Sequence, residues 1–240
     1  MFRFKQVVAA AVAGLFVTAA WAVAQDNAVI KGKALFKGTA PRREVLDTSK
    51  DPNCKKNKAK IGDYQVIVNK TDPPTLRNVL VSVKEGLGDR TFKAPDKPVT
   101  ITQVGCEYEP HVLALMEGQA LKVLNGDETN HNIHFLPKKN EEHNFSQPKP
   151  DAVGKELKLV AEDLPIKVKC DVHPWMGAWV GVFKHPFFAI TGEDGMFTIA
   201  NLPPGKYTIT AWHETYGEQT AEVEVASGAT AEKDFTFEAK

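Results

Sequence analysis

Residues 166–176 read Ile-Lys-Val-Lys-Cys-Asp-Val-His-Pro-Trp-Met. The first four residues are typical of a β-strand. Cys170, His173 and Met176 follow in a short loop, which Pro174 stiffens by restricting one backbone dihedral angle. A strand that ends in a cysteine and continues into such a loop can bring a thiolate, an imidazole and a thioether to one side of a metal ion.

A further donor must come from a different strand, because donors confined to one loop cannot surround an ion. The upstream stretch His131-Asn132-Ile133-His134-Phe135 offers two histidines. In a regular strand His131 and His134 point to opposite faces, so only one of them can face the site. One thiolate, two imidazoles and a weak axial thioether form the donor set of a copper electron-transfer site.

The rest of the chain also reads as β structure. Segments rich in Val, Ile, Thr and aromatic residues recur between Gly, Pro and Asp, a spacing that predicts an all-β sandwich or barrel. Residues 112–124 could be taken for a helix, but Gly118 favours two strands and a turn. The predicted strands are 28–37, 64–69, 78–84, 99–104, 112–116, 120–125, 132–136, 157–161, 166–169, 179–184, 197–200, 206–212, 220–226 and 230–237.

Together, Asn125-Gly126-Asp127, His131-Asn132 and Cys170-x-x-His173-x-x-Met176 resemble the cupredoxin family, plastocyanin and amicyanin in particular. The resemblance covers residues 97–184 and implies a Greek-key β-sandwich. It also implies that Asn132 supports the cysteine loop by a hydrogen bond, as residues around metal ligands commonly do. His134 remains the rival first ligand. The implied copper ligands are His131, Cys170, His173 and Met176.

A second resemblance lies near the carboxyl end. Asp194-Gly195-Met196-Phe197, followed by Leu202-Pro203-Pro204-Gly205-Lys206-Tyr207, is similar to the carboxypeptidase regulatory-like domain, a small transthyretin-like β-sandwich without peptidase activity. Residues 30–41 look like the opening of the same module. We therefore expect residues 28–96 and 185–240 to form one sandwich, split by a cupredoxin-like insertion at 97–184. The alternative is a serial pair, in which residues 28–184 are one cupredoxin with a long amino-terminal extension.

The other two cysteines are expected to pair. Cys170 belongs to the metal motif, which leaves Cys54 and Cys106 as an even pair in a chain that is expected to be exported. Exported thiols are commonly oxidised, so a disulfide between them is our working prediction. Two unpaired thiols, or one of them at a metal, remain alternatives.

The amino-terminal residues predict export. Arg3 and Lys5 precede an apolar run over residues 7–20, and Ala22-Val23-Ala24 forms a small-x-small cleavage signal. This pattern is typical of a secretory signal peptide spanning residues 1–24. We expect a periplasmic or secreted protein without a membrane span in the mature chain. The 30 basic and 30 acidic side chains form no long run of one sign, so no nucleic acid partner is expected.

These observations predict an exported type 1 (blue) copper protein, a one-electron carrier that cycles between Cu(I) and Cu(II). Its partner would be a redox protein such as a cytochrome, docked through a small interface on an exposed copper-side face. No nucleophile with a positioned base is recognisable, so the chain is not expected to be an enzyme. The alternatives are copper delivery or sequestration, and a binding or structural β-sandwich.

The remaining histidines and tryptophans have weaker assignments. His111 is interpreted as structural, and His134 with His143 could form a secondary metal site. Trp175 and Trp179 could cover the copper edge or pack in a core.

Overall fold

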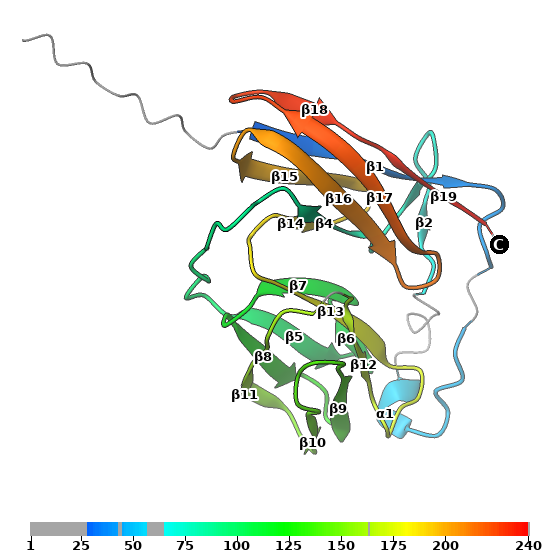
Figure 1. Ribbon diagram of the computed structural model, residues 1–240. Coiled ribbons are helices and arrows are strands. Elements are labelled where there is room, and N and C mark those ends of the chain that lie inside the picture. Colours follow the sequence, from blue (N-terminus) through cyan, green and yellow to red (C-terminus); the bar gives the residue numbers. More distant parts are fainter. Residues whose placement is uncertain (1–27, 43–44, 57–64, 163, 240) are drawn as a thin grey trace, which may run out of the picture.

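The computed structural model describes residues 28–42, 45–56, 65–162 and 164–239. Figure 1 shows two β bodies, one stacked on the other. The predicted signal peptide lies outside the described residues. Within them, no helix has the length and apolar character needed to span a membrane. The predicted all-β class is confirmed, because strands dominate and the one short helix among the described residues is α1 (Pro52–Lys55).

The body at the top of Figure 1, here called the flanking sandwich, takes its strands from both ends of the chain. One sheet has the order β15-β1-β3-β2, with β18 and β19 also paired to β1, and the other has the order β14-β4-β16-β17. Its strands are β1 (Ala28–Lys37), β2 (Val68–Asn69), β3 (Thr75–Leu76), β4 (Leu80–Glu85), β14 (Phe188–Ile190), β15 (Met196–Leu202), β16 (Gly205–His213), β17 (Gly217–Val225), β18 (Thr230–Glu232) and β19 (Phe235–Glu238).

The second body, the central sandwich, is continuous in sequence. Its two sheets have the orders β10-β9-β12-β13-β7 and β11-β8-β5-β6. Its strands are β5 (Val99–Val104), β6 (Glu107–Glu109), β7 (Val112–Met116), β8 (Ala120–Asn125), β9 (His131–Leu136), β10 (Asn144–Gln147), β11 (Asp151–Lys158), β12 (Ile166–Lys169) and β13 (Gly177–Phe183).

Each sandwich has its own apolar core, built by the alternation that a strand imposes on its side chains. In β1 every second residue is buried, so Ile30 and Phe36 join a core that also holds Ile209 of the opposite sheet. In β12 Ile166 and Val168 face a separate core, while the lysines between and after them lie toward the surface. The described core residues of the flanking sandwich come from before 93 and after 186, and those of the central sandwich from 99–182.

The local turn chemistry at Gly118 follows the sequence prediction. Gly118 has a φ of +81°, a conformation that side chains with a Cβ rarely adopt, and it separates β7 from β8. Two strands and a turn therefore replace the helix that the apolar run could suggest. The strand predictions missed other elements: β3, β6, β10, β14 and α1 were not foreseen, and β11 starts at Asp151 instead of residue 157.

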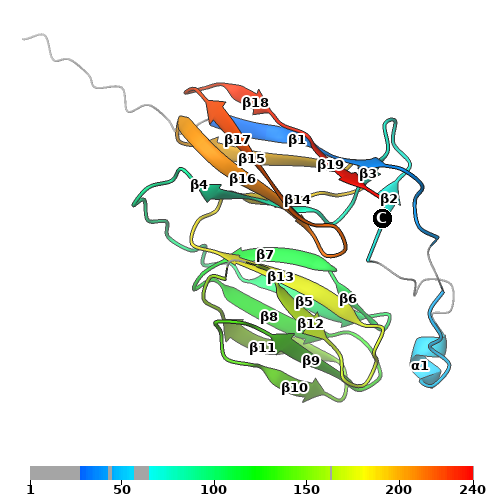
Figure 2. The same ribbon diagram turned by 45° about the vertical axis from the view of Figure 1, so that its right-hand side comes forward.

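The two sandwiches meet at a partly buried carboxylate, Glu214. Glu214, between β16 and β17, accepts a hydrogen bond from Trp179 Nε1 of the central sandwich at 2.9 Å and also pairs with His111. The rings of Trp179 and Trp212 lie 5.0 Å apart. His111 thus has a structural role, and Trp179 packs between the sandwiches instead of covering the metal loop. Figure 2, turned by 45°, shows β7 and β13 along this contact.

Burial of His213 should make the fold less stable in acid. This side chain is 1% exposed and packs near Tyr216 and Phe237. Burial lowers its pKa to about 4; Glu214 raises the pKa and His111 lowers it further, both to smaller extents. In the unfolded chain this histidine has the ordinary pKa of about 6.5. The folded state therefore loses stability as the pH falls from about 6.5 toward 4. We expect a loss of about 2–3 kcal/mol by pH 4.5 relative to pH 7.5 from this residue.

The measurement is urea unfolding at both pH values for the wild type and His213→Gln. The pH-dependent loss should shrink by that amount in the variant, whatever packing cost it carries at pH 7.5. Equal losses in the two proteins would contradict the assignment.

Candidate metal centre

The loop after β12 is closed by its own backbone. Cys170 N–H donates to the Met176 carbonyl at 3.3 Å, and Met176 N–H donates to the His173 carbonyl at 2.9 Å. His173 N–H donates to Cys170 Sγ at 3.3 Å. These bonds turn the chain back so that it re-enters the sheet as β13, and they hold the Cys170 and His173 side chains together.

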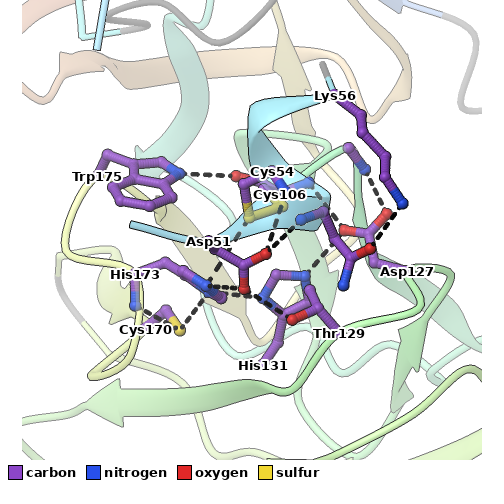
Figure 3. Close-up of a disulfide and its surroundings, with 12 residues drawn as sticks. Asp51, Cys54, Lys56, Cys106, Asp127, Thr129, His131, Cys170, His173 and Trp175 are labelled. Atoms are coloured by element: carbon purple, nitrogen blue, oxygen red, sulfur yellow. Dashed lines mark hydrogen bonds and ion pairs between the residues drawn. A yellow bond between two sulfur atoms is a disulfide. The ribbon is translucent and has the colours of Figure 1, made fainter. Parts of the chain in front are cut away.

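Cys170 and His173 converge with His131 from the head of β9. His131 Nδ1 lies 2.9 Å from His173 Nδ1, and His173 Nδ1 lies 3.8 Å from Cys170 Sγ. The candidate ligand atoms of the three residues all lie within 4.8 Å of one another. Their side chains are almost fully buried, with exposures of 0% for His131, 2% for Cys170 and 3% for His173. This cluster, drawn in Figure 3, is called the inner cluster below.

The inner cluster favours a thiolate. Burial alone would raise the pKa of Cys170, but hydrogen bonds from His131 and from nearby backbone N–H groups outweigh it and lower the pKa. A thiolate is the form of cysteine that binds metals. The loop that positions Cys170 therefore also prepares it as a donor.

Two carboxylates orient the histidines. Asp127 Oδ2 lies 2.8 Å from His131 Nε2, and Asp51 Oδ2 lies 3.1 Å from His173 Nε2. Burial would raise the pKa of each carboxyl, but hydrogen bonds outweigh burial, lower the pKa of Asp127 and bring that of Asp51 to about 2. An ionised carboxylate can only accept, so each Nε2 carries a hydrogen and each Nδ1 faces the inner cluster.

The two histidines differ in their affinity for a second proton. Burial would lower the pKa of His131, but hydrogen bonds to Asp127 and Cys170 outweigh it and raise the pKa. Burial lowers the pKa of His173 despite its contact with Asp51. A contact of 2.9 Å between two Nδ1 atoms needs one proton between them, and these directions place it on His131.

Asn132 ties β9 to the cysteine loop. Its Oδ1 accepts from the Asp171 backbone N–H, and its Nδ2 donates to Asp171 Oδ2 at 3.2 Å and to Asn144 Oδ1 at 2.7 Å. His134 lies on the other face of the same strand, where it contacts Asp171 Oδ2 at 2.9 Å and Glu142 Oε1 at 2.6 Å. The structure therefore brings His131, and not His134, to Cys170 and His173.

Met176 and Trp175 complete the wall around the loop. Met176 is 2% exposed and packs in the core of the central sandwich beside Cys170. The Trp175 ring lies 5.1 Å from that of His173, and its Nε1 donates to the Cys106 carbonyl at 3.1 Å. Trp175 thus covers the His173 side of the loop.

Residues 47–56, here called the strap, lie over the outer edge of His173. Cys54 in α1 forms a disulfide with Cys106, and Asp51 caps α1 by accepting from Asn53 N–H and Cys54 N–H. Asp51 also accepts from Thr129 Oγ1 at 2.8 Å. The expected exposed copper-side face is covered in part, because the strap leaves His173 only 3% exposed, while Val172 of the same loop is 49% exposed. The strap comes from outside the predicted 97–184 segment, so the site depends on both parts of the chain.

Sequence reasoning missed the two carboxylates. Asp127 was noted in the Asn-Gly-Asp motif without an assigned role. Its position four residues before His131 could have suggested a contact between the two side chains. Asp51 carried no such signal, because its partner His173 is 122 residues away. Among the described residues, His134 and His143 do not belong to a cluster of three or more closely spaced potential metal ligands.

Comparisons with known proteins match parts of the chain. Residues 173–238 match the carboxypeptidase regulatory-like domain family, so the match begins inside the metal loop and extends through β19. No curated protein matches the chain.

Among solved structures, a reduced proline-to-phenylalanine variant of amicyanin is similar to 42% of this chain and 97% of its own, with 19% identity and a TM-score of 0.31. A purple cupredoxin from Nitrosopumilus maritimus is similar over 35% of this chain and 97% of its own, with 24% identity and a TM-score of 0.26. A copper-containing nitrite reductase from Thermus scotoductus is similar over 41% of this chain and 25% of its own, with 21% identity and a TM-score of 0.30.

Because Asn132 holds the cysteine loop, its replacement should destabilise that loop. Asn132→Ala removes the acceptor of the Asp171 N–H and should lower the free energy of unfolding by about 1–3 kcal/mol. Hydrogen exchange at the Asp171 amide should accelerate, because this amide loses its intramolecular partner. Urea unfolding and amide exchange followed by NMR measure both effects.

Asn144→Ala is the matched control. Asn144 is exposed and contacts the Asp171 side chain and Asn132 Nδ2, and its removal leaves the bond from Asp171 N–H to Asn132 in place. The control should change stability by less than about 0.5 kcal/mol. Similar losses in the two variants would show that Asn132 does not hold the loop.

Proposed function

We propose that this chain is a copper protein that carries one electron at a time. Its ligands would be His131 Nδ1, His173 Nδ1 and Cys170 Sγ, with Met176 as the weak axial donor. The observation that carries the proposal is the convergence of one nitrogen from each histidine and the cysteine sulfur within 4.8 Å in a buried cluster. Imidazole, thiolate and thioether donors together suit copper in both oxidation states.

The surrounding residues support this donor set. Asp127 and Asp51 hold the Nε2 hydrogens, so both Nδ1 atoms point inward, and copper would replace the proton that His131 Nδ1 carries. Backbone N–H groups favour the Cys170 thiolate, and Asn132 holds the loop that carries it. When bound, copper would supply a single-electron couple. The chain would supply a buried, closely tied set of ligands that changes little between the two oxidation states.

The wider assignment follows the same reasoning. We propose that residues 28–96 and 185–240 form a carboxypeptidase regulatory-like sandwich into which the copper-binding segment 97–184 is inserted. Support comes from the two separate cores, one of which draws on residues before and after the other. We further propose that the chain is exported to the periplasm or secreted, because residues 1–24 read as a signal peptide, and that a redox protein such as a cytochrome is its partner. Four protein donors would leave copper without an open position for a substrate, so we assign no enzymatic activity.

Copper delivery or sequestration is the second candidate function. The observation in its favour is the burial of His173 beneath the strap, which keeps the ligand away from a docked redox partner. A delivery protein would surrender its metal to an acceptor, whereas an electron carrier would retain the metal and exchange electrons quickly.

A Cu(II) titration tests the copper proposal. We expect an intense thiolate-to-copper charge-transfer band that saturates at one equivalent, narrow hyperfine splitting in the electron paramagnetic resonance spectrum, and a reversible one-electron couple. The readouts are the visible spectrum, electron paramagnetic resonance and voltammetry. A colourless or loosely held ion would contradict the blue-copper assignment. Rapid loss of the ion to a copper chelator, without a reversible couple, would favour delivery.

Two histidine variants test the ligand assignment. His131→Ala should nearly abolish the charge-transfer band, because His131 Nδ1 faces Cys170 and His173. His134→Ala is the matched control on the opposite face of β9 and should leave the band largely intact. Cys170→Ser should abolish the band altogether. Equal loss in the two histidine variants would show that the face of the strand does not decide the ligand.

A further inference from the structure

A second set of metal-binding side chains lies on the outer edges of the same two imidazoles. Cys54 Sγ is 3.8 Å from His173 Nε2, which also contacts Asp51. On the other side, the Cys106 N–H donates to Asp127 Oδ2, which contacts His131 Nε2. Figure 3 shows both carboxylates and the disulfide gathered above the histidines.

Each set brings three potential metal-binding side chains close together. The candidate ligand atoms of Asp51, Cys54 and His173 lie within 4.8 Å of one another, and so do those of Cys106, Asp127 and His131. The disulfide joins the two sets, because Cys54 belongs to one and Cys106 to the other. Reduction of that disulfide would provide one site with two thiols, one from each set.

We propose that the reduced chain binds a second metal ion, Cu(I), between the thiolates of Cys54 and Cys106. A disulfide is a poor donor, whereas thiolates are strong ligands for Cu(I). This inference goes beyond the proposed electron-transfer function and does not require copper at the inner cluster. In the oxidised protein the disulfide would then prevent metal binding at this site, and it also cross-links the strap to the central sandwich.

The state of the carboxylates favours Cu(I) over Zn(II). Asp51 already accepts from Asn53 N–H, Cys54 N–H and Thr129, and it contacts His173. Asp127 accepts from the N–H groups of Gly105 and Cys106 and contacts His131. Structural zinc sites almost always need four donors, so zinc would have to break these bonds to recruit oxygen ligands. Cu(I) is selected by soft sulfur ligands, which the two cysteines alone provide.

The chemistry balances with a dithiol reductant. The reductant transfers two electrons and two protons, the Cys54–Cys106 bond breaks, two thiols form, and the reductant closes into its own disulfide. Cu(I) then displaces both thiol protons and forms two copper–sulfur bonds without changing oxidation state. Oxidation of the two thiolates by a disulfide of the same class reverses the sequence and releases the ion.

The position of the strap gives the reductant a route to this site. Cys54 and Cys106 are 0% and 1% exposed, so the reductant reaches them when the strap moves. The helix α1 that carries Cys54 has only four residues and lies at the edge of the central sandwich (Figure 2). A local opening of so short a segment requires no unfolding of either core.

The test uses the whole chain with Cys170→Ser, which removes the inner thiolate and keeps the other two cysteines. The protein is reduced anaerobically with a phosphine, freed of reductant by gel filtration, and titrated with Cu(I) against a coloured chelator. We expect one equivalent to bind to the reduced protein and none to the oxidised protein. The triple variant Cys54→Ser, Cys106→Ser, Cys170→Ser should bind none under the same treatment.

Thiol mapping identifies the ligands without further substitutions. Cu(I) added before alkylation should protect Cys54 and Cys106 together, as read by peptide mass spectrometry. No binding by the reduced protein, no joint protection, or loss of the β-sheet circular dichroism on reduction alone would each overturn the proposal. Failure of the blue-copper assignment would show separately in the Cu(II) spectrum of the oxidised wild type.

Discussion

The antiparallel register between β9 and β12 is the constraint on which the site depends. His134 lies opposite Lys169 and Phe135 opposite Val168, so His131 and Cys170 project from the same buried face. Because side chains alternate along a strand, a slip of one residue would turn His131 outward and bring His134 inward. Ile133 and Phe135 are buried beside His131, and their apolar burial opposes such a slip. The packing of the core thereby selects the histidine.

Burial of polar donors has a cost, and the carboxylates and backbone amides offset it. His131 and Cys170 sit among apolar side chains, where an unpaired polar group is destabilising. Asp127 holds the outer edge of His131, Asp51 that of His173, and the His173 N–H contacts the Cys170 sulfur. The same contacts orient the donor atoms toward one another. The stability of the fold and the orientation of the donor atoms therefore depend on the same hydrogen bonds.

The strap makes the site a property of both parts of the chain. It begins in the segment before the central sandwich, crosses to it through the Cys54–Cys106 disulfide, and covers His173. Glu214 ties the flanking sandwich to His111 and Trp179 of the central sandwich. His173 is thus covered by a segment that contributes no residue to the core of the central sandwich.

Local signals in the sequence, namely alternation and turn residues, were enough to predict the all-β class, the bounds of strands such as β1, β5 and β12, and the turn at Gly118. The sequence also placed Cys170, His173 and Met176 in one loop and limited the further donor to one face of β9. Short edge strands such as β6 and β10 were missed, because their residues have weak alternation and form strands only through their neighbours. The pairing of Asp51 with His173, across 122 residues, and the burial of His173 beneath the strap were decided by the tertiary structure alone. Long-range contacts of this kind follow from how sheets and loops pack, and no local pattern of residues encodes them.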